Sequence, residues 1–194
     1  LKHFVDYGIG EGRRASESFD VTLYKANYPD LQELFGDDNT KYVDHYLDYG
    51  INEGRCANRR ILNGISVASD GKKYYYKNDQ VDTSYTGFAA YQGNMYYVLG
   101  GIVSNYTGLI NYYGTWYYLQ SGSVKWDYTS LVEHSDGAWY YVEKGILNWN
   151  YNGLVEYYGT LYYIQNGYLN WGYSGRIWYN GKWYKIVNGV AQKD

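Results

Sequence analysis

Tryptophan and tyrosine stand two residues apart at three places in this sequence, and their rings are the side chains best suited to binding a ligand. The pairs are Trp126 with Tyr128, Trp149 with Tyr151, and Trp171 with Tyr173. Because residues two apart share one side of an extended segment, each pair is expected to form a flat platform for an apolar sugar face. The polar neighbours expected to take the sugar hydroxyls are Asn148, Glu156, Gln165 and Asn170. The alternative is that these rings wedge adjacent structural units together.

The residues that support catalysis are missing from the recurring part of the sequence. The acidic residues after residue 60 are scattered, with no recurring carboxylate pair of the kind that glycosidases use. His134 is the only histidine there, no Cys/His cluster could hold zinc, and no serine lies in a nucleophile elbow. We therefore expect no enzyme activity, no catalytic residue, no metal site and no cofactor.

The aromatic residues belong to a repeat that runs from Gly64 to Asp194 with a period of 21 to 23 residues. Units of this size cannot bury a core without their neighbours, so the period predicts a solenoid. Within a unit, a strand such as Leu109 to Tyr113 meets a glycine turn and is followed by a strand such as Trp116 to Gln120. This pattern predicts a β-hairpin, and single hairpins must stack to be stable.

The first 60 residues differ from the rest and predict short helices. Asp20 can cap one helix, Pro29 is placed to open a second, and Gly36 to stop it. Apolar residues at helical spacing follow Thr40, and Gly50 suits the position just past the end of this third helix. The fold class is therefore α+β in two modules, a small all-α module followed by a β-solenoid of stacked β-hairpins.

Single residues of this segment are expected to be structural. Residues 1–15 recur 42 positions later as residues 43–57, which aligns His3 with His45. One histidine per unit favours a capping or packing role over a metal ligand. Glu53 and Arg55 are expected to form an ion pair or to anchor a loop, and Cys56 has no partner cysteine in the chain.

Charge and hydropathy limit the partners. Residues 1–60 hold 8 Lys/Arg against 11 Asp/Glu, while residues 61–194 hold 9 of each, which predicts a domain boundary near residue 60. The absence of a basic stripe argues against nucleic acid, and no run of about 18 apolar residues suits a transmembrane segment. The expected domains are residues 1–60 and residues 61–194, the second with about six repeats.

The repeats resemble a known family. The segments GTWYYLQSG from Gly114, GAWYYVEKG from Gly137, GTLYYIQNG from Gly159 and GKWYKIVNG from Gly181 are similar to choline-binding, or cell-wall-binding, repeats of Gram-positive surface proteins. Related repeats occur in glucan-binding proteins and clostridial toxins. FDVTLYKANYPDL from Phe19 and HYLDYGINEGR from His45 resemble a helical repeat of bacterial secreted and surface proteins. The resemblance implies ligand grooves between consecutive repeats and a secreted or cell-surface location.

Choline cages of that family use an aromatic residue just after the first glycine of each repeat, a ring of the Trp-Tyr-Tyr strand and a ring of the next repeat. Here the position after the first glycine holds no tryptophan and is leucine in three repeats. We therefore expect attachment to cell-wall polysaccharide or another glycan, with choline of teichoic acid as one alternative. A structural or adhesive stalk that presents a protein-docking face is the other. The candidate ligand-binding residues are Trp116, Trp126, Tyr128, Trp139, Trp149, Tyr151, Trp171, Tyr173 and Trp183.

Overall fold

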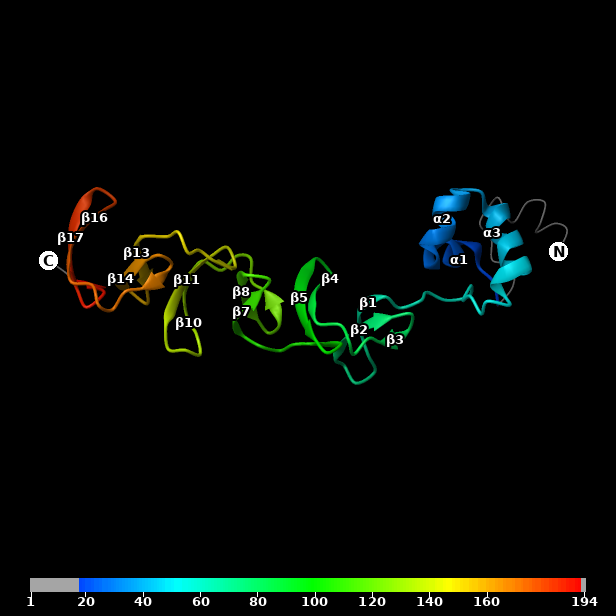
Figure 1. The fold of residues 1–194 in the computed structure, drawn as a ribbon, viewed down its shortest axis with the longest axis horizontal. Helices are drawn as coiled ribbons and strands as arrows, with labels where there is room; N and C mark the ends of the chain where they lie inside the picture. Colours follow the sequence, from blue (N-terminus) through cyan, green and yellow to red (C-terminus); the bar gives the residue numbers. More distant parts are fainter. Residues whose placement is uncertain (1–17, 193–194) are drawn as a thin grey trace. The chain divides into compact units, whose positions relative to one another are not determined.

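The computed structural model describes residues 18–192, and internal contacts divide the chain into two units (Figure 1). One unit is Leu1–Asn63 with Lys77–Gln80, and the other is Gly64–Tyr76 with Val81–Asp194. The first contains the helices α1 (Val21–Asn27), α2 (Pro29–Phe35) and α3 (Asn39–His45), followed by a π-helical turn, η2 (Tyr46–Gly50). None of the described helices has the length and apolar content needed to cross a membrane.

The three helices predicted from the sequence are confirmed, together with two of their boundary signals. The Asp20 carboxylate accepts hydrogen bonds from the backbone N–H groups of Thr22 and Leu23, at 2.9 and 3.1 Å, and so caps α1. Pro29 is the first residue of α2, where its missing N–H leaves no hydrogen bond unmade. The helices enclose Tyr24 and Tyr42, both fully buried.

The role predicted for Gly50 was wrong. The helical path continues through η2 and past Gly50, so this glycine does not end the helix in a left-handed conformation. Instead, a Cβ atom at Gly50 would collide with the Tyr24 hydroxyl, so the residue is small because two elements meet there. The Tyr24 hydroxyl also lies 3.0 Å from Nδ1 of His45, which confirms the packing role expected for that histidine.

The remaining structural expectations for this unit have mixed outcomes. Arg55 donates hydrogen bonds to Glu53 at 2.5 Å and to Asp30 at 2.9 Å, so the predicted ion pair is present and has a second carboxylate. Cys56 is a free, partly buried thiol. His3 lies outside the described residues.

The second unit consists of β-hairpins that follow one another along the chain, as the sequence predicts (Figure 1). We number them in order by their two long strands. The first three are β1 (Gly64–Val67) with β2 (Lys73–Lys77), β4 (Gly87–Tyr91) with β5 (Asn94–Leu99), and β7 (Gly108–Tyr112) with β8 (Thr115–Gln120). The fourth to sixth are β10 (Ser130–Glu133) with β11 (Trp139–Glu143), β13 (Gly153–Tyr157) with β14 (Thr160–Gln165), and β16 (Gly175–Tyr179) with β17 (Lys182–Val187).

A two-residue strand follows each hairpin, and from the second hairpin onward this short strand pairs with a long strand of the hairpin before. These short strands are β3 (Gln80–Val81), β6 (Ile102–Val103), β9 (Ser123–Val124), β12 (Ile146–Leu147), β15 (Tyr168–Leu169) and β18 (Val190–Ala191). For example, β9 belongs to the third hairpin and pairs Ser123 with Tyr96 of the second. A backbone hydrogen bond of 2.9 Å from Tyr97 N to Gly122 O strengthens the same junction. The stacked hairpins of the predicted β-solenoid are therefore confirmed.

Glycine is required where one hairpin meets the backbone of the preceding linking stretch. Gly122 has φ +80°, and a Cβ atom there would collide with the carbonyl oxygen of Ser104. Gly114, at the tip of the same hairpin, has φ +84° but no atom within 4 Å of its Cβ position. The tip glycine thus serves only the two-residue turn, whereas Gly122 also allows the hairpins to stack.

Candidate functional site

The tyrosine of each predicted Trp-Tyr pair is a structural residue of the hairpin stack. The rings of Tyr128, Tyr151 and Tyr173 pack at centroid distances of 4.2, 4.1 and 4.4 Å on Tyr118, Tyr141 and Tyr163. Each hydroxyl donates a hydrogen bond to the carbonyl three residues later; for Tyr128 the acceptor is Leu131 O, at 2.8 Å. The packing of these tyrosines therefore agrees with the alternative in which the rings hold adjacent units together.

The tryptophan of each pair has a different environment. Trp126, Trp149 and Trp171 are 45, 45 and 49% exposed, so their indole faces remain partly open to solvent. Each stands edge-on to the first of the two consecutive tyrosines in the second long strand of the preceding hairpin. Trp171 does so with Tyr162 at a centroid distance of 5.8 Å and an interplanar angle of 81°. The two rings of a pair thus have separate neighbours, and the expected shared platform is replaced by an exposed indole beside a packed phenol.

Four rings from two consecutive hairpins line one cavity of about 210 Å³. We call this the aromatic cage; its rings are Trp139 of the fourth hairpin and Tyr157, Tyr162 and Trp171 of the fifth. Trp139 and Tyr157 meet at 5.2 Å with an interplanar angle of 68°. Leu131 and Leu169 complete the lining.

The lining determines which ligands the cage suits. It contains no carboxylate and no amide side chain, and burial raises the pKa of Tyr157, so this phenol stays uncharged near neutral pH. Electron-rich ring faces around a small apolar space attract a cation that carries methyl groups. Leu131 occupies the position at which the sequence argued against choline, yet it lines a cavity whose rings come from other positions.

The equivalent places in earlier repeats differ from the aromatic cage. Between the third and fourth hairpins, His134 stands at the position equivalent to Tyr157, and its ring centroid lies 5.2 Å from that of Trp116. Its Nδ1 atom is buried without a hydrogen-bond partner among the described residues. Between the second and third hairpins, the Phe88 ring packs on Tyr112 and Tyr117, at 5.1 and 4.9 Å, and fills the space itself.

Polar grooves accompany two of the exposed indoles. Trp149, Glu143 and Asn148 line a groove of about 310 Å³, in which Asn148 Nδ2 donates a 2.8 Å hydrogen bond to the Glu143 carboxylate. Trp126 lines a groove of about 420 Å³ with Gln120, Lys125 and Asp127 among its neighbours. An exposed ring beside planar polar groups suits a sugar, because the ring takes the apolar face and the polar groups take the hydroxyls.

The other predicted polar residues are divided between these places. Asn170 Nδ2 donates to the Gln165 side chain at 2.7 Å, which repeats the Asn148–Glu143 contact one hairpin later. Glu156 lies on β13 opposite Leu161 and is exposed. Trp183 is 58% exposed and packs edge-on against Trp178 at 5.5 Å.

Sequence reasoning missed Tyr157 and Tyr162 as members of the candidate site. Both stand at repeat positions that hold tyrosine in most hairpins, and that recurrence was the available signal. For metal binding, the residues from 18 to 192 contain no group of three or more His, Cys, Asp or Glu side chains that could hold an ion.

Comparison with known proteins identifies the repeats. The choline-binding repeat family matches residues 84–104, 105–125, 127–148 and 150–170. Choline binding protein F from Streptococcus pneumoniae, solved in the presence of a peptidoglycan analogue, is 26% identical over 68% of this chain and 41% of its own, with a TM-score of 0.33. The choline binding domain of Spr1274 from Streptococcus pneumoniae is 31% identical over 44% of this chain and 94% of its own, with a TM-score of 0.29.

Alternansucrase is also among the similar structures. Alternansucrase in complex with isomaltotriose is 19% identical over 68% of this chain and 11% of its own, with a TM-score of 0.33. This chain thus spans less than half the length of choline binding protein F and a small part of alternansucrase. None of the curated proteins matches the sequence.

Proposed function

Because residues 84–170 of this chain belong to the choline-binding repeat family, we propose that the chain is a non-catalytic module that attaches a secreted protein to a bacterial cell wall. The binding sites lie between consecutive hairpins, and the ligand is a repeating wall polymer. Several weak sites along one solenoid hold such a polymer by avidity, because each binding event after the first is intramolecular. The proposed location of the protein is therefore the cell surface.

The observation that carries the proposal is the aromatic cage, and it favours a methylated ammonium group such as choline. Four rings and two leucines surround about 210 Å³ without a carboxylate or an amide. The ring faces compensate a quaternary ammonium for its lost hydration, whereas the hydroxyls of a sugar would stay unpaired against such a lining. In this reading, choline substituents of a wall polymer enter the cage and the polymer chain remains outside.

A specific observation also favours glycan as a second ligand. The groove of Trp149 offers an exposed indole with the Glu143 carboxylate and the Asn148 amide beside it. These polar groups could bind sugar hydroxyls while the ring takes an apolar sugar face. The exposure of the three linking-stretch tryptophans argues against the alternative of a stalk in which these rings only hold hairpins together.

Calorimetric titration of the folded chain with two probes separates these ligands. The probes are choline chloride and a wall polysaccharide from which choline has been removed. Saturable choline binding supports the cage, and polysaccharide binding that Trp149→Ala abolishes supports the groove. If the folded chain binds neither the choline-bearing wall nor any purified wall glycan, the attachment function is wrong.

A further inference from the structure

Lys73 stands in the first hairpin where tryptophan stands in the third and fourth. The strand register fixes this equivalence, because Lys73 pairs with Val67, the last residue of β1, as Trp139 pairs with Glu133, the last residue of β10. The aromatic partners correspond as well. Tyr91 and Tyr96 of the second hairpin take the places that Tyr157 and Tyr162 take in the fifth.

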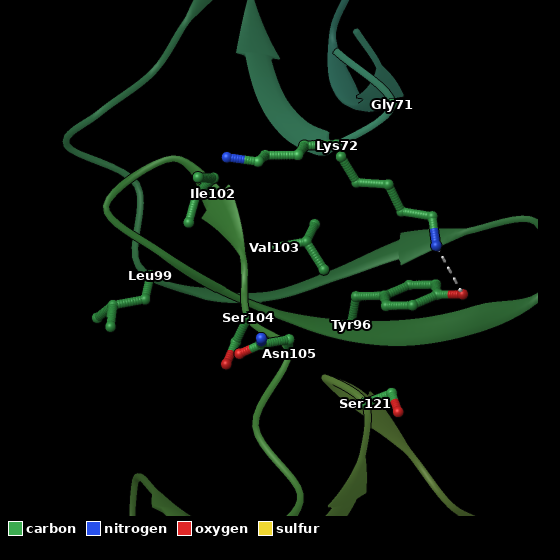
Figure 2. A pocket seen from close by; sticks show the side chains of 10 residues that line it. Gly71, Lys72, Tyr96, Leu99, Ile102, Val103, Ser104, Asn105 and Ser121 are labelled. Atoms are coloured by element: carbon green, nitrogen blue, oxygen red, sulfur yellow. Dashed lines mark hydrogen bonds between the residues drawn. The ribbon is translucent and has the colours of Figure 1, made fainter.

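The ammonium group of Lys73 lies against these two rings. Its Nζ atom is 4.5 Å from the centroid of Tyr96 and 5.8 Å from that of Tyr91. It is also 3.5 Å from the Tyr96 hydroxyl, and the dashed line in Figure 2 marks this contact at the edge of a groove of about 550 Å³. These distances are those of a cation–π contact.

The positive charge of Lys73 is stabilised by the two tyrosine rings and not by a carboxylate. Within residues 18–192 its side chain takes part in no salt bridge of 4.0 Å or less. Lys72 is a useful contrast, since it lines the same groove, is exposed, and in Figure 2 points away from Tyr96. Two neighbouring lysines therefore place their charges in different environments.

We propose that Lys73 is a built-in occupant of the first cage, the place bounded by Tyr91 and Tyr96 between the first and second hairpins. Its ammonium takes the position against these rings that a ligand ammonium takes in the aromatic cage. The first cage is thus closed to ligand while the cage of Trp139 is open. This inference rests on the proposed function, because the closed cage is defined by the ligand that the open one accepts.

The repeats are consequently unequal in function. Phe88 occupies the equivalent place between the second and third hairpins with its own ring, as the Lys73 ammonium occupies the first cage. Ligand binding is confined to the later hairpins, and Lys73 limits the number of sites without altering the stack. The sequence offers the replacement that reopens the first cage, because Trp139, a wall of the aromatic cage, stands at the equivalent position of the fourth hairpin.

The occupancy of the first cage is tested without ligand by nuclear magnetic resonance of the full chain. Ring currents from Tyr91 and Tyr96 should shift the ε-methylene protons of Lys73 upfield of those of Lys72. The Tyr96→Leu variant should move them back toward the Lys72 position. A Lys73 signal that coincides with that of Lys72 in the native chain overturns the proposal.

The closure is tested by equilibrium dialysis with labelled choline at constant ionic strength. Lys73→Trp should bind one more choline per chain than the native protein, and Lys72→Trp, which makes the same exchange at the neighbouring lysine, should not. Circular dichroism confirms that each variant is folded. Equal stoichiometry in the native chain and in folded Lys73→Trp contradicts closure. If the native chain binds no choline, the proposed ligand is wrong, and the ring-current result still decides whether Lys73 occupies the rings.

Discussion

Replacing Trp171 by alanine should remove one wall of the aromatic cage and leave the hairpin stack in place. The indole is 49% exposed, and its described ring contact is the edge-on one with Tyr162 at 5.8 Å. Its loss therefore opens no enclosed cavity. We expect the free energy of unfolding to change by less than about 1 kcal/mol, as for other substitutions at partly exposed positions.

The effect on binding should be larger than the effect on stability. One ring face of a partly desolvated cation–π site contributes about 1 to 2 kcal/mol. Because about 1.4 kcal/mol corresponds to a tenfold change in affinity, the Kd for choline at this cage should rise roughly 5- to 30-fold. Isothermal titration calorimetry measures this change, with potassium chloride replacing choline chloride in the reference titration.

Tyr173→Ala is the matched control, two residues further along the same linking stretch. Its ring packs on Tyr163 at 4.4 Å, and its hydroxyl donates to the carbonyl of Arg176 at 3.3 Å. Loss of this half-buried ring should destabilise the chain by about 2 kcal/mol. For a chain of this size, that lowers the Tm by roughly 4 to 8 °C.

The two variants together can refute the reasoning. If Trp171→Ala lowers the Tm as much as Tyr173→Ala does and leaves the Kd for choline unchanged, the indole is a wedge and not a wall of the cage. If Tyr173→Ala leaves the Tm unchanged, the structural role assigned to the linking-stretch tyrosines is wrong.

Three further changes test other parts of the structure. Gly122→Ala should cost about 3 kcal/mol or more, because its Cβ meets the Ser104 carbonyl, whereas Gly114→Ala, with similar φ and open space, should cost about 1 kcal/mol; equal thermal shifts would contradict the close approach. His134→Tyr replaces a buried, unpaired Nδ1 with the residue of the next hairpin, so the free energy of unfolding should rise by about 1 kcal/mol in denaturant melts, and a loss would count against this. Burial raises the pKa of Tyr24 to about 12, while the unfolded chain releases this proton near pH 10. The contribution of Tyr24 to the stability of the helical unit should therefore be constant below pH 10 and fall as the pH rises toward 12, and Tyr24→Phe should flatten this fall in circular dichroism melts.

The hairpins could be predicted because their signals are local. A glycine in a two-residue turn with β-branched and aromatic residues on both sides determines a hairpin wherever it occurs, and β7 and β8 fall within a residue of the predicted strands. The same holds for α1 and α2, whose starts are marked by Asp20 and Pro29. The prediction for Gly50 failed because the requirement for glycine there is not local. The Tyr24 hydroxyl, which leaves no room for a side chain at Gly50, approaches from another helix.

The site could be predicted only in part for the same reason. Spacing in the sequence suggested that Trp171 and Tyr173 act together, but they pack on Tyr162 and Tyr163, adjacent residues of β14 whose side chains point to opposite faces. The cage instead joins Trp139 to Tyr157, which are 18 positions apart and meet only when two hairpins stack. The members of such a site follow from the stacking register, and a single repeat does not contain that register.

The hydrogen bond that each hairpin donates to the next has a consequence for how such chains change over generations. The bond from Tyr97 to Gly122 is repeated from Tyr118 to Gly145 and from Tyr141 to Gly167, with distances of 2.8 to 2.9 Å. Every junction therefore has the same connector. Duplication or loss of one whole unit in the gene leaves each remaining junction intact. The number of units, and with it the reach of the protein, is free to vary by inheritance while the joints stay the same.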